Sequence, residues 1–474
     1  MRYHRRVLAR SAVGLLSSVV FLVSLHVFRD HLASWDLGAI RLQRTFALAE
    51  GVPLYPPPGE GVAMLPLYGP VGAIVHLPAV LAGSPTCAIA IGQLLGLLYF
   101  FTPPLAWHLA VGRRTGHPAL ALLAFLLFVA GSIDLWPLEY AAFTVHVDAP
   151  ALGFALLACL ALFRATAATW RCAYGLVWFG PPQVLWFHLV TVPSRHPWRL
   201  GGGGHALLTG AGVLGRELAT LWAICLMTLG LRIGGLRTQA GTDRRQALRR
   251  EPSLLLWLVG LAMLPTALLG FVKVGGDRNA FSYVAYFFLA GATLSLLETA
   301  TAAADRPALT RSRGLARFAL LAIPTLLLAI VATAQEPGSL RPWRHPLNRD
   351  TLPHEIAFRY ARRHPGEAYF PRLTLASYFA EGRLYHQSPG FIDAYYAGVP
   401  IDEETLWAHL PPRLRIVAFA RNGYQDQVGF LPFREQLEVV PDDPELPGFD
   451  IYEWRGEGRG PSPSGRRGPP PAVP

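Results

Sequence analysis

Charged residues are scarce in this sequence. Asp, Glu, Lys and Arg make up 15% of the 474 residues, whereas hydrophobic residues make up 52%. Lysine is almost missing, because Lys273 is the only one among 42 Lys and Arg residues, a bias that points to a GC-rich genome more than to a function. The apolar residues fall in blocks of roughly 14 to 26, most of them near the length that a bilayer requires. This composition predicts an all-α polytopic membrane protein.

Cysteine is also rare, and its distribution excludes two kinds of scaffold. Cys87, Cys159, Cys172 and Cys225 lie in or beside apolar blocks without C-x-x-C spacing, which indicates neither a disulfide framework nor a zinc site. The formal charge of +11 does not indicate nucleic acid, because the arginines stand in short gaps between apolar blocks and not on one soluble face. Membrane orientation is the better interpretation of these charges.

About nine apolar blocks are predicted to be transmembrane helices. The first follows a basic N-terminus, is longer than the core of a signal peptide and lacks a small-residue cleavage site, so it is predicted to be an uncleaved span. The predicted spans are Ser11–Phe28, Thr86–Val111, Ala119–Ile133, Ala149–Phe163, Ala173–Val192, Leu218–Leu231, Ser253–Val272, Phe281–Leu297 and Phe318–Ala334.

Arginine placement predicts the orientation in the cell membrane. With the N-terminus in the cytoplasm, the inner gaps hold far more arginine than the outer gaps, as the positive-inside rule requires. This holds only if the apolar segment Pro66–Leu81 does not cross, because a crossing would place Arg113 and Arg114 outside. We therefore expect this segment to be a re-entrant or juxtamembrane half-helix.

A different kind of sequence follows the last span and is predicted to lie outside the cytoplasm. We expect residues 1–334 to form the transmembrane domain, 335–456 a small soluble α/β domain and 457–474 a disordered tail rich in Pro, Gly and Ser. In the soluble part the patterns predict a helix at Pro353–Arg363 and strands at Ala368–Pro371, Leu414–Ala420 and Phe449–Trp454.

The predicted outer loops carry acids and bases from four parts of the chain. Such groups near a bilayer surface suit a substrate that is both anionic and lipid-linked, because its phosphate stays at the interface while its sugar reaches the water. These residues are Asp36, then Asp134, Glu139, His146 and Asp148, then Arg195 and His196, then Lys273, Asp277, Arg278 and Asn279.

Several motifs along residues 1–300 occur in one order on the predicted outer side. Asp36 lies in the first outer loop, a Gly-x-x-x-Tyr turn follows at Gly51–Tyr55, and Pro66-Leu67-Tyr68 opens the half-helix. His146-Val147-Asp148 precedes the fourth span, and Lys273–Asn279 forms a late loop. Together they resemble the GT-C superfamily of integral membrane glycosyltransferases, mannosyltransferase-like enzymes that use polyprenyl-phosphate sugars as donors.

The resemblance implies a role for each of these residues. Asp36 would be the catalytic base of an inverting transfer, and Asp148 with His146 would position the acceptor or hold a divalent cation. Lys273, Arg278 and Asn279 would bind the donor phosphate. Simpler readings stay open: Asp36 and Asp148 as helix caps, and the two cations as partners of lipid headgroups. A divalent cation is the one candidate cofactor, without being required, and the acceptor would be a lipid or a cell-envelope glycan.

Two departures from the family pattern keep other functions open. Leu37 follows Asp36 where protein O-mannosyltransferases usually have a paired Asp-Glu, and His146 stands where relatives often have arginine. One alternative is a transporter or flippase of a lipid-linked glycan, which would predict ionisable residues within the spans and related halves. Another is an inactive family member whose outer domain binds a partner. The near absence of charge within the predicted spans favours the transferase.

Overall fold

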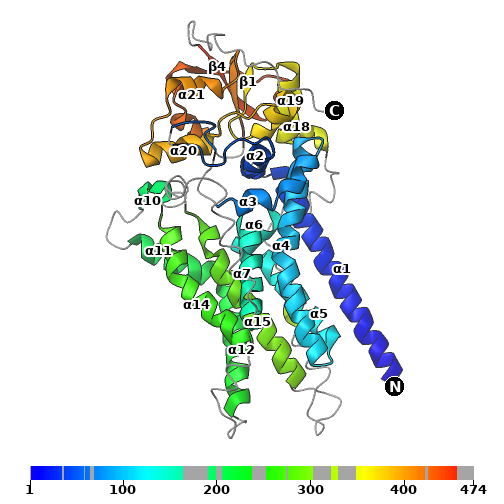
Figure 1. Ribbon diagram of the computed structural model, residues 1–474. Coiled ribbons are helices and arrows are strands. Elements are labelled where there is room, and N and C mark those ends of the chain that lie inside the picture. The colour runs from blue at the N-terminus through cyan, green and yellow to red at the C-terminus, as the bar shows by residue number, and fades with distance from the viewer. Residues whose placement is uncertain are drawn as a thin grey trace.

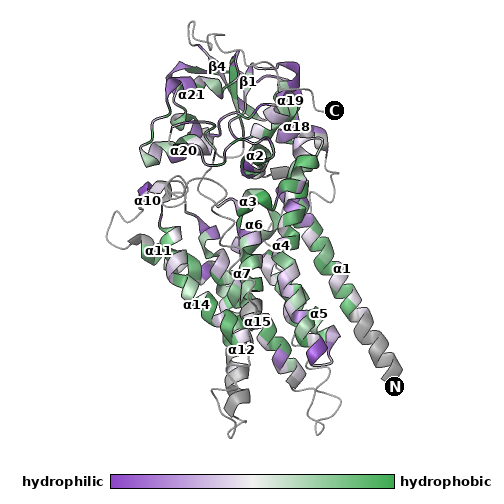
Figure 2. Cartoon of the chain, in the orientation of Figure 1, coloured by the Kyte–Doolittle hydropathy of each residue, from purple (hydrophilic) through white to green (hydrophobic). Residues whose placement is uncertain are grey.

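The chain is mostly helical, with a small sheet at one end. The computed structural model describes residues 2–34, 37–57, 59–64, 69–163, 191–198, 205–237, 252–273, 276–302, 322–328, 348–421 and 425–455. Long helices form one end of the molecule, and a four-stranded sheet with short helices forms the other (Figure 1). Figure 2 shows that hydrophobic residues dominate the long helices, whereas hydrophilic residues concentrate around the sheet.

Within these described residues, four helices are long and apolar enough to cross a membrane. They lie in α1 (Arg2–Ser34), α4 (Pro85–Arg114), α14 (Pro252–Phe271) and α15 (Ser282–Ala302) with its preceding turn η5 (Arg278–Phe281). Two bent helix pairs would raise the number to six: α5 (Pro118–Asp134) with α6 (Trp136–Phe143), and α11 (His205–Glu217) with α12 (Ala219–Arg237). The predicted number of nine spans is therefore not confirmed.

Most of the predicted spans are nonetheless helical. Those near α1, α4, α5, α12, α14 and α15 are confirmed as helices, and the fourth corresponds to the short helix α7 (Asp148–Phe163). The span predicted at 173–192 falls almost wholly outside the described residues, and that at 318–334 is described only at 322–328, which is helical. Of the predicted half-helix Pro66–Leu81, residues 66–68 lie outside the described part of the chain, and the rest contains two short pieces, α3 (Val71–Ile74) and the 3₁₀ turn η1 (Leu77–Leu81).

Two prolines in the middle of α4 shape the core of the helical part. Pro103 and Pro104 have no N–H to donate to the carbonyls four residues earlier, which belong to Tyr99 and Phe100. The Phe100 carbonyl instead accepts a hydrogen bond from the hydroxyl of Tyr286 at 2.9 Å. Both rings are fully buried, so a backbone group released by proline joins α4 to α15.

The connection between α5 and α6 corrects one expectation. The two helices meet at 99° around Leu135, whose backbone is extended, and Pro137 stands in the first turn of α6. Proline suits a first turn because its missing N–H has no intrahelical partner there. Asp134 and Glu139, predicted to lie in an outer loop, therefore belong to helices: Asp134 ends α5 and Glu139 lies within α6.

The sheet agrees with the strand and helix predictions for the C-terminal part. The strand order is β1-β2-β4-β3, with β1 parallel to β2 and the other pairs antiparallel. The predicted helix α18 (Pro353–Arg363) is confirmed with its bounds, and the strands β1 (Ala368–Tyr369), β2 (Ile416–Ala420) and β4 (Phe449–Trp454) are confirmed. The remaining elements are α10 (Val192–Arg195), η6 (Arg349–Thr351), α19 (Thr374–Glu381), α20 (Ser388–Ala397), α21 (Glu403–Ala408), η7 (Gln425–Phe430), η8 (Arg434–Gln436) and β3 (Leu437–Val440).

Helix α2 (Leu37–Ala49) joins the sheet-bearing part to the long helices and lies between them in Figure 1. The side-chain amide of Gln43 donates to the Tyr385 carbonyl at 2.7 Å. The amide of Gln387 donates to the Ile40 carbonyl and to Oε1 of Gln43, both at 2.7 Å. Both glutamine side chains are fully buried, so losing either partner would leave buried polar groups unpaired.

A neutral histidine fixes the segment after α2 to the sheet-bearing part. The backbone N–H of Ala63 donates to Nδ1 of His386 at 2.8 Å, and Nε2 donates to the Leu406 carbonyl at 3.2 Å. Burial, followed by the nearby His409, lowers the pKa of His386 to about 3. The imidazole uses one nitrogen as an acceptor and the other as a donor, which only its neutral form can do.

Stability is expected to fall as the pH is lowered from about 6.5 towards 3. The unfolded chain binds a proton at His386 in this range while the folded chain does not, so acid favours unfolding by about 2 kcal/mol between pH 6.5 and 5. The melting temperature of the purified protein across this range measures the effect. The variant His386→Asn keeps an acceptor for Ala63 but does not titrate, so its melting temperature should depend less on pH. An equal dependence in both proteins would exclude His386 as the cause.

Candidate functional site

The candidate site forms around the loop between α6 and α7, residues 144–147. Val145 is buried between α2 and α4, where a Cβ added at Gly92 would lie 2.9 Å from its Cγ2. On the same face of α4, a Cβ at Gly96 would lie 3.4 Å from the carbonyl oxygen of Thr144. Glycine at 92 and 96 thus lets the loop approach α4 closely, and this fixes the start of α7.

His146 and Asp148, both predicted as site residues, are in contact. The backbone N–H of Asp148 donates to Nδ1 of His146 at 3.0 Å, and the same nitrogen lies 3.3 Å from Oδ2 of Asp148. The hydroxyl of Ser282, the first residue of α15, donates to that oxygen at 3.2 Å. The carboxylate therefore links the start of α7 to the start of α15.

The surroundings keep the Asp148 carboxylate charged. Burial alone would raise its pKa, but His146, Arg41 and the Ser282 hydroxyl together bring the pKa below its ordinary value. Burial lowers the pKa of His146, and the positive charge of Arg41 adds to this effect, whereas Asp148 opposes it. A charged carboxylate thus lies beside an imidazole that prefers to be neutral.

Arg41 reaches this loop from α2. Its guanidinium donates from Nη1 to the Val145 carbonyl at 2.8 Å and from Nη2 to the hydroxyl of Tyr140 at 2.6 Å. The ring of Tyr140 in turn lies 5.0 Å from that of His146. We call Arg41, Tyr140, His146, Asp148 and Ser282 the site cluster; its members come from four helices and one loop.

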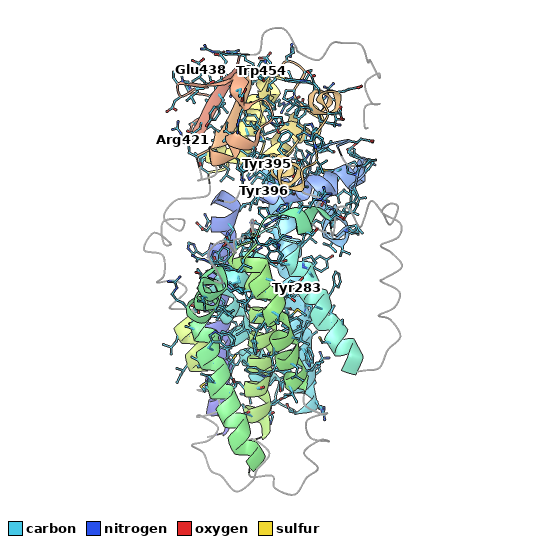
Figure 3. The ribbon with its side chains drawn as sticks, turned by 90° about the vertical axis from the view of Figure 1, so that its left-hand side faces the viewer. Tyr283, Tyr395, Tyr396, Arg421, Glu438 and Trp454 are labelled. Atoms are coloured by element: carbon cyan, nitrogen blue, oxygen red, sulfur yellow. The ribbon has the colours of Figure 1, made fainter. Side chains whose placement is uncertain are left out.

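Arg278, predicted to bind the donor phosphate, lies beside the site cluster. Its guanidinium carbon is 5.8 Å from the ring centre of Trp136, at the distance of a cation–π contact. Trp136 stacks on Tyr140 with ring centres 5.1 Å apart. Figure 3 shows Tyr283, the neighbour of Ser282, on the long helices, with Tyr395 and Tyr396 on the sheet-bearing part beyond it. The end of α15 that carries the site thus faces the sheet-bearing part.

The other predicted site residues are not all joined to the site cluster. The Lys273 ammonium lies 5.6 Å from the ring centre of Trp198, with which Lys273 forms an isolated antiparallel bridge. Asn279 is half-buried, and its carbonyl accepts from the N–H of Ser282. Asp36, the predicted base, lies outside the described residues, as does Gly275.

Arg41, Tyr140 and Ser282 are the members that the sequence-based prediction missed. The available signal was a set of polar residues in an amphipathic segment: Arg41, Gln43, Arg44 and Thr45 follow one another closely, and the last three are buried. A helix that buries so many polar groups must satisfy them with partners. Nothing in the sequence indicated that Tyr140 would be one of those partners.

The described residues do not by themselves form a metal centre. No group of three or more His, Cys, Asp or Glu side chains comes together where a metal ion could bind in the parts of the chain that are described. Calcium and magnesium take six or more ligands, and zinc usually takes four. Among the described residues, His146 and Asp148 could supply part of the ligand set of the predicted divalent cation, and water or a substrate phosphate would supply the rest.

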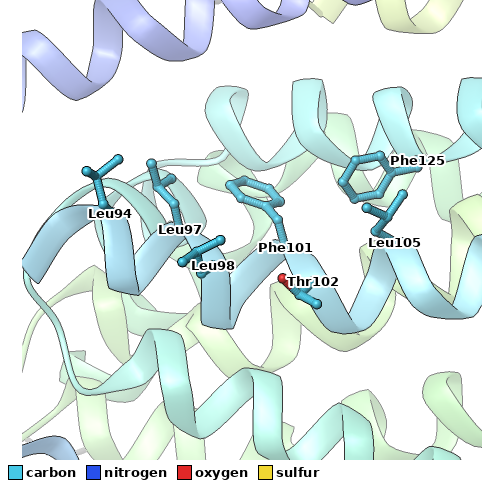
Figure 4. Close-up of a pocket in the computed structure, with 7 residues that line it drawn as sticks. All are labelled: Leu94, Leu97, Leu98, Phe101, Thr102, Leu105 and Phe125. Carbon is cyan, nitrogen blue, oxygen red and sulfur yellow. The ribbon is translucent and has the colours of Figure 1, made fainter. Parts of the chain in front are cut away.

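An apolar groove of about 470 Å³ on α4 lies apart from the site cluster. Leu94 and Leu98, which line it, are about 200° around the helix from Gly92 and Gly96, which face the loop. Because no lining residue is ionisable, this groove is not where proton transfer occurs. Figure 4 shows the lining residues Leu94, Leu97, Leu98, Phe101, Thr102, Leu105 and Phe125.

Comparisons with known proteins identify no relative of this chain. No family model matches this chain, and neither a curated protein nor a solved structure matches it.

Proposed function

We propose that this chain is a membrane glycosyltransferase that moves a sugar from a polyprenyl-phosphate donor to a lipid or cell-envelope glycan outside the cytoplasm. The observation that carries the proposal is the half-buried Asp148 carboxylate, which accepts from Ser282, lies 3.3 Å from Nδ1 of His146 and is close enough to Arg41 for that charge to act on it. A fixed carboxylate near a cation suits a reaction in which a hydroxyl group attacks an atom bound to phosphate.

The reaction needs a base, an orienting group and a cation. The acceptor O–H loses its proton to the base as its oxygen bonds to the anomeric carbon. The bond from that carbon to the phosphate oxygen breaks, and polyprenyl phosphate leaves with the electron pair. We assign Asp36 as base, Asp148 with His146 as the group that orients the acceptor, and Arg278, Lys273 and Asn279 as the donor-phosphate site. A cation near the leaving phosphate stabilises the charge that develops there.

The state of Asp148 supports this division of labour. A carboxylate whose pKa is lowered is a weak proton acceptor but a strong hydrogen-bond acceptor. It suits holding a hydroxyl better than removing its proton. The base is therefore assigned to another acid, Asp36, in agreement with the family resemblance.

Replacing Asp148 by Asn is expected to reduce sugar transfer about 10- to 100-fold, because a hydrogen bond to a charged group is worth about 1.5–3 kcal/mol. The effect should appear mainly as a higher KM for the acceptor. The measurement is transfer from radiolabelled polyprenyl-phosphate sugars in membranes with equal amounts of each variant.

Asp402→Asn is the matched control for this exchange. Asp402 is exposed and caps α21 by accepting from the N–H of Thr405, a role that Asn fills equally well, so transfer should be unchanged. Wild-type transfer by Asp148→Asn would remove Asp148 from the site. If the wild type transfers no sugar from any donor, the transferase proposal fails. The result would then favour a transporter or a binding protein.

A further inference from the structure

His76 is a buried histidine with a fixed tautomer. It precedes η1, is 2% exposed, and its Nδ1 lies 2.7 Å from the Gly72 carbonyl. Because a carbonyl can only accept, Nδ1 carries the hydrogen, and the neutral ring keeps its lone pair on Nε2. Burial lowers the pKa of His76, and the charge of Arg41 lowers it further. The neutral form with an acceptor at Nε2 is thus the one present near pH 7.

His108 shows how the same arrangement is completed elsewhere in the chain. Its Nδ1 also lies 2.7 Å from the carbonyl four residues earlier, that of Pro104. Its Nε2 lies 3.1 Å from the hydroxyl oxygen of Thr293, whose one proton it shares with the Leu289 carbonyl at 3.0 Å. For His76, no hydrogen-bond partner of Nε2 is found in the described part of the chain. A buried acceptor without a donor costs about 1–3 kcal/mol, and a ligand that donates a hydrogen bond to it would recover this free energy.

The segment that carries His76 lies against the site cluster. The hydroxyl of Thr45 on α2 donates to the Ala73 carbonyl at 3.1 Å, which holds α3 next to the helix that carries Arg41. On the other side, a Cβ added at Gly72 would lie 2.6 Å from Cγ1 of Val147, so α3 touches the loop between His146 and Asp148. Two members of the site cluster, Arg41 and His146, are close enough to act on the charge of His76.

The chemistry around Nε2 limits what can bind there. The ligand group must donate a hydrogen bond, which a fully ionised phosphate oxygen cannot do. It must also be uncharged, because the Arg41 guanidinium nearby would repel an ammonium group. A hydroxyl group meets both conditions, and sugars carry several.

We propose that Nε2 of His76 accepts a hydrogen bond from a hydroxyl group of the sugar that binds at the site cluster, and so helps to select that sugar. The identity of the ligand as a sugar rests on the proposed function. The hydroxyl belongs either to the donor sugar or to the acceptor, and the experiment distinguishes the two.

Two substitutions of His76 test the roles of Nδ1 and Nε2 separately. His76→Asn keeps a donor at the position of Nδ1 for the Gly72 carbonyl but removes the acceptor at Nε2. His76→Gln places a carbonyl oxygen near the position of Nε2. Binding of radiolabelled polyprenyl-phosphate mannose, polyprenyl-phosphate glucose and an octyl glycoside to the purified protein is measured without turnover, and KM and kcat are measured where transfer occurs.

His76→Asn is expected to weaken binding of one of these probes about tenfold, the upper end for an uncharged hydrogen bond, with kcat little changed. His76→Gln should bind more tightly than His76→Asn. A loss for the polyprenyl-phosphate probes assigns the hydroxyl to the donor, and a loss for the glycoside assigns it to the acceptor. Equal binding by wild type and both variants, or no binding of any probe to the wild type, would overturn the proposal. Binding without transfer would instead reject only the transferase function.

A stability measurement tests the premise without any sugar. His108→Asn removes the ring nitrogen that contacts the Thr293 hydroxyl and should lower the melting temperature. His76→Asn removes an acceptor that has no protein donor and should leave the melting temperature unchanged or raise it. An equal loss in both variants would show that Nε2 of His76 serves the fold, and would contradict its assignment to a ligand.

Discussion

Exchanging Asp36 for Asn is expected to reduce sugar transfer by about 10²- to 10⁴-fold, the contribution of a general base. Asn has nearly the same shape but cannot take a proton. Asp148 is not expected to replace it, because His146, Ser282 and Arg41 stabilise the charged form of Asp148 and so weaken it as a base. The loss should appear in kcat and not mainly in KM, which distinguishes it from the effect of Asp148→Asn.

Membranes that contain equal amounts of wild type, Asp36→Asn and Asp30→Asn provide the measurement. Asp30 lies in α1, six positions before Asp36, and controls for the loss of one acid in this part of the chain. A base also predicts that kcat/KM of the wild type falls at acidic pH as its carboxylate is protonated. Full transfer by Asp36→Asn would assign the base to a different residue.

Hydropathy correctly predicted where most helices lie, but it did not predict how many of them are long enough to span a membrane. The third span was predicted to end at Ile133, one residue before α5 ends, but the residues after it were predicted to form a loop and not the helix α6, which meets α5 at 99° around Leu135. The bend depends on the extended backbone at Leu135 and on Pro137, which starts a new helix. Of the sheet, only β3 was missed among the strands, because its residues are half to fully exposed and include a glutamate, a composition that is also typical of loops.

Of the candidate site, only residues within the motifs that resemble the GT-C superfamily were predicted. His146 and Asp148 are neighbours in the sequence, so their contact needed little knowledge of the fold. Arg41, by contrast, joins the site through Val145 and Tyr140, which lie about a hundred positions away. Such a contact depends on how closely α2 approaches α4, and this is set by glycines and not by charge.

The role of His76 could not be predicted from the sequence either. A histidine in an apolar segment is most often a satisfied core residue, and His108 is an example. Both histidines bond the carbonyl four residues earlier, so only the position of Thr293 beside Nε2 of His108 distinguishes the two. The difference between a core residue and a ligand-binding one is here a single hydroxyl group.

Gly153→Ala is expected to destabilise the protein by about 3 kcal/mol, near the upper end for overpacking. A Cβ at this position would lie 2.2 Å from the carbonyl oxygen of Tyr99, which belongs to the backbone of α4 and cannot turn away as a side chain can. Pro103 has no N–H to donate to that oxygen, and the absence of a side chain at 153 lets α7 pack directly against it. The exchange should therefore push α7 away from α4.

The melting temperature of the purified protein measures this effect, with Gly212→Ala as the matched control. Gly212 is also helical, and no atom lies within 4 Å of its added Cβ, so its exchange should leave stability unchanged or raise it by up to about 1 kcal/mol. Because α7 begins at Asp148, its displacement should also disturb the site cluster, and sugar transfer by Gly153→Ala should fall below that of Gly212→Ala even at temperatures where both are folded. Equal melting temperatures for the two variants would show that α4 and α7 do not pack as closely as Tyr99 and Gly153 indicate.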